Sequence, residues 1–333
     1  MKKILVTGGA GYIGSHTVVE LLKAGYKPII IDNLCNTSIQ NIYGINKITS
    51  EKVKWYNIDC TDKMAMNKVL DKENNIEGVI HFAAFKSVEE SVRNPKRYYT
   101  NNLRSLEILL QCMREYNIKN IIFSSSCTVY GMPDILPVDE NAPFKKAESP
   151  YGETKQICEK ILLDDTCNSI ALRYFNPIGS HKSALIGDCS ADKPSNLVPI
   201  LTETAIGKRE KITVFGDDYD THDGTCIRDY IHVVDLAKSH VLAMGYIIEK
   251  PGKHAFNIGT GIGLSVLDII TIFERSNNLK ISYSIRPRRD GDIEQIYANG
   301  TFAKEELNWE AEESLEQAMI SAYNWQKFKH NAK

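Results

Sequence analysis

Three residues of this 333-residue chain have types and a spacing suited to removing a proton from an alcohol. Tyr151 and Lys155 lie four positions apart, so on a helix they would share one face. A free tyrosine has a pKa of about 10, and a nearby ammonium group and a helix N-terminus both favour the phenolate. We therefore expect the pKa of Tyr151 to be lowered toward neutrality. The phenolate could then take a proton while hydride leaves the same carbon, with Ser126 bridging to the alcohol oxygen.

A glycine-rich turn near the start of the chain has the spacing of a dinucleotide-binding loop. It reads T-G-G-A-G-Y-I-G from Thr7 to Gly14 and follows an apolar run. Glycines at Gly8, Gly11 and Gly14 allow a tight turn and a close approach of backbone to a pyrophosphate, which a following helix N-terminus attracts. Asp32, at the end of the next apolar run, can accept hydrogen bonds from ribose hydroxyls and would repel a 2′-phosphate. The pattern favours NAD over NADP.

The elements that must position these residues alternate along the first half of the chain. We expect buried strands at residues 4–6, 28–31, 53–58, 79–82, 121–123 and 170–172, and helices at residues 15–24, 98–116 and 149–164. Such alternation implies a Rossmann-type α/β fold, with a doubly wound parallel sheet and helices on both faces. Ser149 is a natural N-cap and Pro150 suits the first helical position, so a helix should begin just before Tyr151.

The second half of the chain is less regular. After about Asn176, prolines and glycines punctuate short apolar segments. We expect residues 1–176 to form the NAD-binding domain and residues 177–333 to form a smaller α/β lobe that binds the substrate. Residues 230–244 and 255–259 again resemble a helix and a strand, and they could return to the main sheet.

Composition excludes several classes of function. Apolar residues make up 43% and charged residues 25% of the chain, and the formal net charge is −2, so nothing indicates nucleic-acid binding. The eight cysteines are scattered, without the spacing of a metal site, which favours reduced thiols in a cytoplasmic protein. The first apolar run is too short for a signal peptide, and no stretch approaches the length of a membrane span.

Several longer motifs resemble the extended short-chain dehydrogenase/reductases and, among them, the UDP-glucose 4-epimerase family. They are G-G-A-G-Y-I-G-S-H (8–16), D-N-L (32–34), H-F-A-A-F-K-S-V-E-E-S (81–91), S-S-S-C-T-V-Y-G (124–131), S-P-Y-G-E-T-K (149–155), R-Y-F-N-P-I-G (173–179), R-D-Y-I-H-V-V-D-L-A (228–237) and P-R-R-D-G-D (287–292). The resemblance runs nearly end to end. It implies an enzyme of galactose metabolism that interconverts UDP-glucose and UDP-galactose through a transient 4-keto sugar. NAD would stay tightly bound and Tyr151 would act as acid and base.

The resemblance also implies a set of binding residues. For NAD they are Gly8, Gly11, Tyr12, Ile13, Gly14, Asp32, Asn33, Leu34, Cys35, Asn36, Thr37, Asp59, Cys60, Phe82, Ala83, Ala84, Phe85, Lys86, Asn101, Ser126, Tyr151, Lys155 and Phe175. For the UDP-hexose they are Lys86, Ser126, Tyr151, Asn176, Asn196, Leu197, Ile212, Thr213, Val214, Arg228, Arg289, Asp292 and Ile296. A small residue at the position of Ile296 goes with N-acetylated sugars in this family, and isoleucine leaves that question open. A homodimer formed through helices 98–116 and 149–164 is implied as well.

Other interpretations stay open. A sugar-nucleotide dehydratase or decarboxylase of the same superfamily would need an added acid just after Ser126, where this chain has cysteine and threonine. A simple alcohol dehydrogenase would leave the C-terminal motifs unexplained. A non-catalytic NAD-binding protein could share the fold, although such proteins commonly lack the tyrosine or the lysine. Among single residues, Asp59 is equally an ordinary turn residue, and Arg228 could be a surface partner of an acid such as Asp229.

Overall fold

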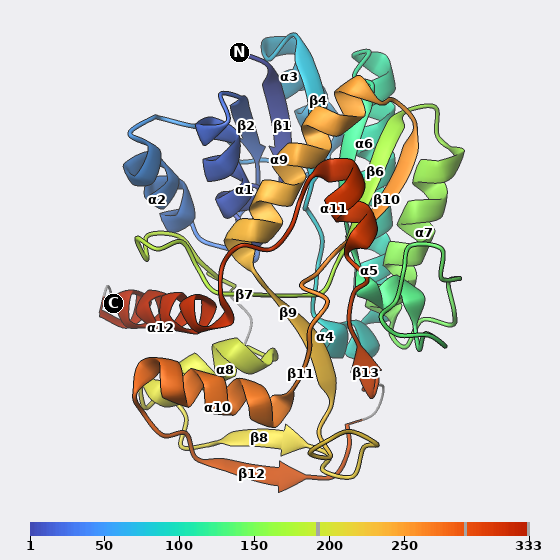
Figure 1. The fold of residues 1–333 in the computed structure, drawn as a ribbon. Coiled ribbons are helices and arrows are strands. Elements are labelled where there is room, and N and C mark those ends of the chain that lie inside the picture. Colours follow the sequence, from blue (N-terminus) through green and yellow to red (C-terminus); the bar gives the residue numbers. More distant parts are fainter. Residues whose placement is uncertain (191–193, 290–291, 332–333) are drawn as a thin grey trace.

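A seven-stranded parallel sheet forms the centre of the computed structural model, which describes residues 1–190, 194–289 and 292–331 (Figure 1). The strand order is β10-β6-β5-β4-β1-β2-β3, and every neighbouring pair is parallel. This is the doubly wound order, so the predicted Rossmann-type fold is confirmed. The strands are β1 (Lys3–Thr7), β2 (Lys27–Ile31), β3 (Lys54–Tyr56), β4 (Ile76–His81), β5 (Asn120–Ser126), β6 (Asn168–Tyr174) and β10 (Lys253–Ile258).

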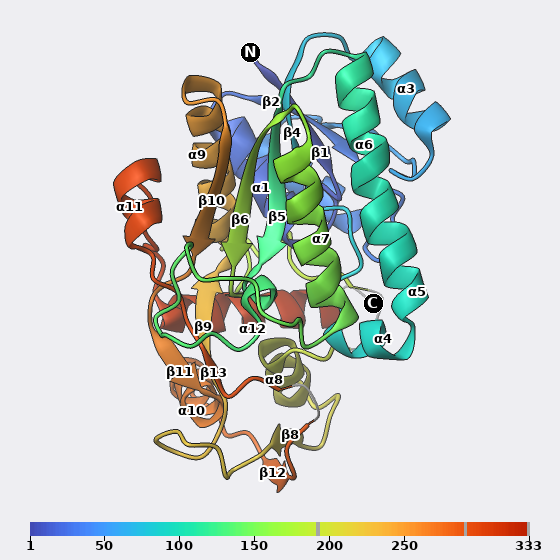
Figure 2. The same ribbon diagram turned by 90° about the vertical axis from the view of Figure 1, so that its right-hand side faces the viewer.

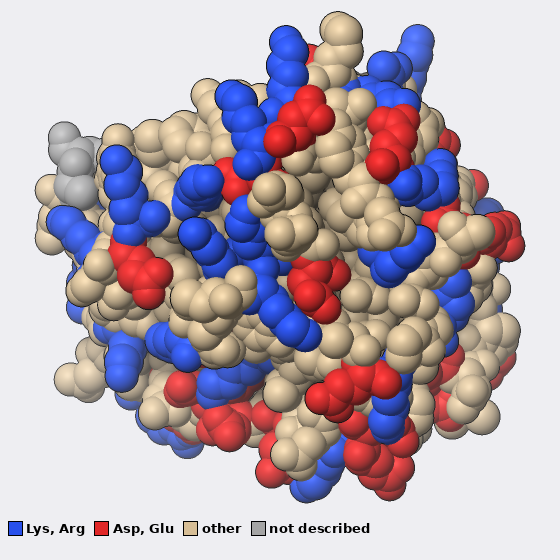
Figure 3. Space-filling model, turned by 90° about the horizontal axis from the view of Figure 1, so that it is seen from above, with Lys and Arg blue, Asp and Glu red and all other residues tan. Residues whose placement is uncertain are grey.

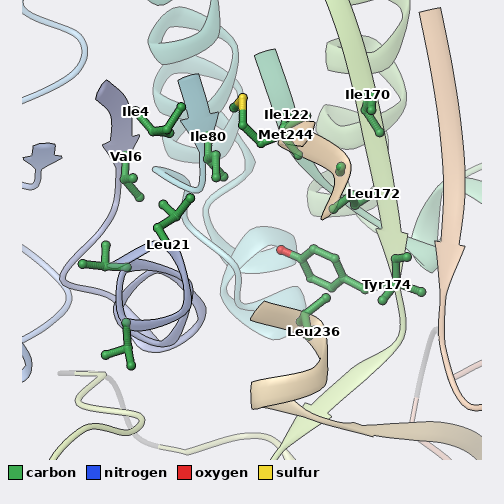
Figure 4. Packing of buried hydrophobic residues seen from close by; sticks show 14 of the residues in the cluster. Ile4, Val6, Leu21, Ile80, Ile122, Ile170, Leu172, Tyr174, Leu236 and Met244 are labelled. Atoms are coloured by element: carbon green, nitrogen blue, oxygen red, sulfur yellow. The ribbon is translucent and has the colours of Figure 1, made fainter. Parts of the chain in front are cut away.

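Helices cover both faces of the sheet because its strands carry apolar side chains on both sides. One face packs against α1 (Tyr12–Lys23), α2 (Gln40–Thr49) and α9 (Val233–Glu249), and the other against α3 (Lys63–Lys72), α6 (Arg104–Glu115) and α7 (Pro150–Asp164). Ile4 and Val6 of β1 belong to the first core, and Leu5 between them belongs to the second. Figure 4 shows the first core, in which Leu21 of α1 faces the sheet.

The helices near the site begin where their sequences allow. α1 begins at Tyr12 rather than at the predicted Ser15, because the glycine loop leads straight into it. Ser149 caps α7 by accepting a hydrogen bond from the Gly152 N–H (3.2 Å), and Pro150 takes the first helical position, as predicted. The predicted helix 98–116 is one continuous helical segment of α5 (Pro95–Tyr98), the π-helical η1 (Tyr99–Leu103) and α6. The shorter α4 (Val88–Arg93) precedes it, and the 3-10 turn η2 (Cys127–Tyr130) follows β5.

The second half of the chain builds a lobe at the carboxyl ends of the sheet strands, below the sheet in Figure 1. Two small sheets lie there, one of β7 (Asn176–Ile178), β9 (Ile227–His232), β11 (Gly263–Ser265) and β13 (Gln295–Ile296), the other of β8 (Ile212–Phe215) and β12 (Tyr283–Arg286). The helices of this half, besides α9, are α8 (Leu197–Ala205), α10 (Val266–Asn277), α11 (Thr301–Leu307) and α12 (Leu315–Asn331). α8, α10 and α12 share a separate core.

Two predicted segments differ from the structure. Residues 230–244, expected to be helical, begin inside β9, and α9 starts only at Val233, where the His232 imidazole accepts a hydrogen bond from the Val234 N–H (3.0 Å). β-branched residues at this junction suit the strand as well as the helix, so periodicity alone misplaced the boundary. The expected strand 53–58 is shorter, since only Lys54–Tyr56 pairs with β2.

The surface shows no bias of charge on the face seen in Figure 3. Basic and acidic side chains are interspersed there, as the net charge of −2 leads one to expect. All eight cysteines are free thiols. Within the described part of the chain, no helix is both long enough and apolar enough to cross a membrane.

Candidate active site

A cavity of about 760 Å³ lies between the carboxyl ends of the central strands and the lobe. All but one of the residues expected to bind NAD or the UDP-hexose line it. The exception is Leu34, which adopts a left-handed backbone conformation (φ 56°) and packs its side chain against the first core. Its N–H donates a hydrogen bond to the Asp32 carboxylate (2.9 Å), and its expected place in the cofactor site stays a prediction.

The glycine loop has the geometry of a pyrophosphate cradle. Gly8 adopts φ +70°, and a Cβ atom on Gly14 would lie only 2.3 Å from the Gly8 carbonyl oxygen, so neither position accepts a side chain without strain. No side chain caps the N-terminus of α1, which leaves its N–H groups pointing toward the loop. Asp32 accepts a hydrogen bond from the Ala10 N–H (3.0 Å), which fixes the loop beside the acid. These residues fit a dinucleotide.

Asp59 acts both as a turn residue and as part of the cavity wall. Its carboxylate accepts hydrogen bonds from the Thr61 N–H and hydroxyl (both 2.7 Å) and from the Asn33 amide (2.8 Å). Burial alone would raise the pKa of Asp59, but these hydrogen bonds outweigh it and lower the pKa. The two interpretations of Asp59 are thus compatible.

Ser126, Tyr151 and Lys155 all line the cavity, where β5 ends beside the first turns of α7. The Lys155 ammonium donates a hydrogen bond to the Ser124 carbonyl oxygen (2.5 Å). It lies 5.7 Å from the centre of the Tyr151 ring, so the pair shares one helix face as the spacing predicts. The Ser126 hydroxyl accepts from the Thr128 N–H (3.2 Å).

The protonation state of Tyr151 differs from the expectation. Burial raises the pKa of Tyr151 above its usual range, and a hydrogen bond with Ser126 lowers it only in part. Burial also lowers the pKa of Lys155 to about 8. The expected lowering of the Tyr151 pKa is therefore wrong for the protein alone. Both groups are removed from water, and the ammonium group is hydrogen-bonded to a carbonyl rather than to the phenol.

Two arginines of the lobe, Arg228 and Arg289, also line the cavity. Arg228 lies on β9 and donates to the Ile227 carbonyl oxygen (2.8 Å), whereas Arg289 follows β12 and forms an ion pair with Asp292 (2.8 Å). The possible pairing of Arg228 with Asp229 is not formed. Asp229 points to the other side of β9, where its carboxylate accepts hydrogen bonds from backbone N–H groups and the Thr260 hydroxyl.

The remaining parts of the expected site are the motif at residues 287–292 and Ile296. Asp290 and Gly291 of the P-R-R-D-G-D motif lie outside the described residues. Ile296 lies on β13, is 3% exposed and lines the cavity within a small apolar cluster that includes Phe175.

Sequence reasoning missed several parts of the cavity wall, among them two segments. One comprises residues that follow β7, namely Gly179, Asp188 and Ser190, and the other comprises Trp325, Gln326 and Lys329 of α12. Apart from Gly179, these residues belong to no recognisable motif, and they reach the cavity only through tertiary packing. The one available signal was the glycine within R-Y-F-N-P-I-G (173–179), which adopts φ +85°.

Comparison with known proteins finds relatives over nearly the whole chain. A family model described as GDP-mannose 4,6 dehydratase matches residues 5–321. The UDP-glucose 4-epimerase of Haemophilus influenzae is 47% identical over 329 residues, which cover 97% of each chain. The human UDP-glucose 4-epimerase is 44% identical over 337 residues, covering 98% of this chain and 97% of the human protein. The chain belongs to the UDP-glucose 4-epimerase family. The resemblance seen in the motifs is thereby confirmed.

A solved member of the UDP-glucose 4-epimerase family has the same fold throughout. The Bifidobacterium longum enzyme, determined in complex with NAD+ and UDP, is 45% identical, and it matches with a TM-score of 0.95 over 100% of both chains. The prediction of an enzyme of this class is confirmed.

The matching family model carries a dehydratase description, but the residues beside Ser126 do not supply a dehydratase's extra acid. Burial raises the pKa of the Cys127 thiol to about 12, and the next residue is Thr128. Neither can act as a carboxylic acid, which sets this epimerase-family chain apart from that chemistry.

Proposed function

We propose that this protein interconverts UDP-glucose and UDP-galactose by inverting C4 of the hexose, with NAD as its tightly held cofactor. The observation that carries the proposal is the meeting of Ser126, Tyr151 and Lys155 in one cavity with the glycine loop. The family relatives at 44% to 47% identity support the substrate. We also propose a division of labour in which residues 1–176 hold NAD and residues 177–333 hold most of the UDP-hexose.

The cofactor would rest on the glycine loop, with its adenosine ribose near Asp32 and its nicotinamide half near Lys155. When bound, NAD supplies a hydride acceptor that later returns the hydride, and in its oxidised form it adds a positive charge to the buried site. Because no net oxidation of the sugar occurs, the same NAD molecule can serve every turnover.

Proton transfer belongs to Tyr151. As hydride leaves C4 of the sugar, the Tyr151 oxygen takes the proton of the C4 hydroxyl, and the Ser126 hydroxyl holds the same oxygen. The proton must leave a phenol whose pKa burial raises, so positive charge near the ring is needed, and the Lys155 ammonium provides part of it. When hydride returns to the opposite face of the 4-keto sugar, Tyr151 gives the proton back.

Inversion needs a firm hold on UDP and a loose hold on the hexose. In this proposal Arg228 and Arg289 approach the diphosphate from two separate chain segments with forked donors. Asn176, Asn196 and Asp292 line the same wall. The 4-keto sugar can then turn about its bond to the diphosphate while UDP stays in place.

The protein's setting is part of the proposal. We expect a homodimer in the cytoplasm, with α6 and α7 at the subunit interface. Both helices lie on one outer face of the sheet in Figure 2, and Leu163 on α7 is 59% exposed. The eight free thiols suit a reducing compartment.

Conversion of UDP-galactose to UDP-glucose, with no nucleotide added, tests the function. The Tyr151→Phe variant should lose at least about 100-fold in rate, because general acid–base catalysis contributes on that order. Tyr116→Phe is the matched control, because it removes a phenol hydroxyl bonded to Asp71 far from the cavity and should leave the rate unchanged. If the wild-type protein converts nothing even with NAD supplied, the proposal fails for this substrate.

A further inference from the structure

A segment that links the two halves of the molecule forms part of the cavity wall beside the cofactor loop. This strap, residues Gly179–Ser190, follows β7 and contributes Gly179, Asp188 and Ser190 to the cavity. Several side chains of the NAD-binding half hold it. The Tyr12 hydroxyl donates to the Gly179 carbonyl oxygen (2.6 Å), His16 Nε2 accepts from the His181 N–H (2.9 Å), and the Lys86 ammonium pairs with the Asp188 carboxylate (3.2 Å).

The chemistry of His16 fits its role as an acceptor. Its Nδ1 atom lies 2.7 Å from the Tyr12 carbonyl oxygen and carries the proton, which leaves Nε2 with a lone pair toward the strap. Burial lowers the pKa of His16 to about 3, so the ring stays neutral over the physiological range. Tyr12 and His16 both lie in the first turns of α1, directly after the glycine loop.

Asn41 of α2 ties the strap to the glycine loop itself. Its amide group is fully buried and donates to two carbonyl oxygens, that of Ala10 in the loop (2.9 Å) and that of Gly187 in the strap (3.0 Å). Its oxygen accepts from the Gly187 N–H (3.2 Å). One side chain thus joins the cofactor loop to the segment that faces it.

The strap packs closely between α2 and α12. A Cβ atom on Gly44 of α2 would lie 2.2 Å from the Leu185 carbonyl oxygen, and one on Gly187 would lie 2.5 Å from the Trp325 ring of α12. The Trp325 indole N–H also donates to the Asp188 carbonyl oxygen (3.3 Å). Movement of the strap away from α2 would break both hydrogen bonds between Asn41 and Gly187.

We propose that the strap retains NAD between turnovers and that Asn41 is the positioning residue that holds it closed. The inference rests on the proposed function, in which the pyrophosphate lies on the glycine loop. In an epimerase, the reduced cofactor must stay until it returns its hydride, because its loss would strand the 4-keto sugar. A strap fixed to the loop by buried hydrogen bonds meets that need, since opening would leave buried polar groups without partners.

Release of NAD from the purified protein tests the inference directly. Asn41→Leu keeps the size of the side chain and removes its hydrogen bonds, and Asn41→Asp keeps the acceptor for the Gly187 N–H but loses both donors. NAD-loaded protein is diluted into an apo-dehydrogenase that captures free NAD. We expect release to be at least about tenfold faster for Asn41→Leu, with Asn41→Asp also faster than wild type. With saturating NAD, the turnover rate should stay within about twofold of wild type.

Asn120→Leu is the matched control. Asn120 is buried at the start of β5, far from the cavity, and its amide donates to the Glu77 carbonyl oxygen (3.1 Å) and accepts from Asn168 (3.0 Å). It should lower the melting temperature as Asn41→Leu does but leave NAD release unchanged. Release at the wild-type rate from folded Asn41 variants, or equally fast release from Asn120→Leu, would overturn the inference. A wild-type protein that neither carries NAD nor converts UDP-galactose with NAD supplied would instead refute the proposed function.

Discussion

At the scale of single residues, burial shifts the pKa values of the groups proposed to be catalytic. Lys155 is 4% exposed, and burial lowers its pKa from 10.5 to about 8. The difference corresponds to about 3 kcal/mol against the charged form in the folded state. A charged lysine in this position therefore lowers the stability of the fold. Such a loss of stability is common where a residue is kept for activity.

Lys155→Met should stabilise the NAD-free protein while abolishing conversion of UDP-galactose. Because the folded-state pKa of Lys155 lies below the unfolded value, its penalty is fully present below pH 8 and disappears as the pH rises past 10.5. We expect a free energy of unfolding about 1–3 kcal/mol higher than wild type at pH 7, since the lost hydrogen bond to Ser124 offsets part of the gain. Urea unfolding of the variant and the wild type at pH 7 and pH 10 measures the gain in the free energy of unfolding and its dependence on pH. A difference from wild type that does not shrink at the higher pH contradicts the argument.

The residues that the sequence could place are those whose neighbours in the chain define their role. Gly14, Tyr151 and Ser126 each belong to a short motif at the end of a predicted element, and all three line one cavity. Asn41 could not be found in this way, because the glycine that it binds lies 146 positions further along the chain. The prediction that the pKa of Tyr151 is lowered was wrong for a related reason. The burial of Tyr151 depends on tertiary packing, which the four-residue spacing from Lys155 does not reveal.

At the scale of elements, the cap of α7 positions Tyr151, the proposed acid and base. Ser149→Ala removes the acceptor for the Gly152 N–H and should lower the free energy of unfolding by about 1 kcal/mol. Since the first turn of α7 carries Tyr151, we expect the turnover rate to fall several-fold as well. Ser265→Ala is the control, because Ser265 caps α10 in the lobe through a capping box. It should destabilise without slowing turnover, and equal turnover in both variants would show that the cap of α7 is only structural.

The central strands were easier to predict than those of the lobe, for a physical reason. A strand of a parallel sheet is buried on both faces and appears as a continuous apolar run, such as Leu5 and its neighbours in β1. In the lobe, β13 has only two residues and β9 runs directly into α9, so no such run marks their limits. These elements depend on pairing with distant strands, and local sequence leaves their bounds open.

At the scale of the whole molecule, both halves of the chain line the cavity. The glycine loop, Asp32 and Asp59 come from the first half, whereas Arg228 and Arg289 come from the second. With a net charge of −2, the chain as a whole does not attract a diphosphate, so the proposed binding depends on the local arginines. If the two halves bind the two ligands separately, as proposed, a substitution can weaken the binding of UDP without weakening the binding of NAD.

Arg228→Met and Arg289→Met test that independence. Each should weaken UDP binding by about 10- to 100-fold, because a hydrogen bond to a charged group contributes about 1.5–3 kcal/mol. The ion pair of Arg289 with Asp292 joins side chains three residues apart, and the arginine is 46% exposed, so the guanidinium can exchange this partner for a diphosphate at little cost. Calorimetric titration with UDP measures the binding, and the NAD content of the same preparations should equal that of wild type. Arg275→Met, which removes an exposed arginine paired with Glu316 elsewhere on the lobe, should change neither quantity. Loss of NAD together with UDP binding would mean that the arginines support the cavity as a whole rather than the nucleotide alone.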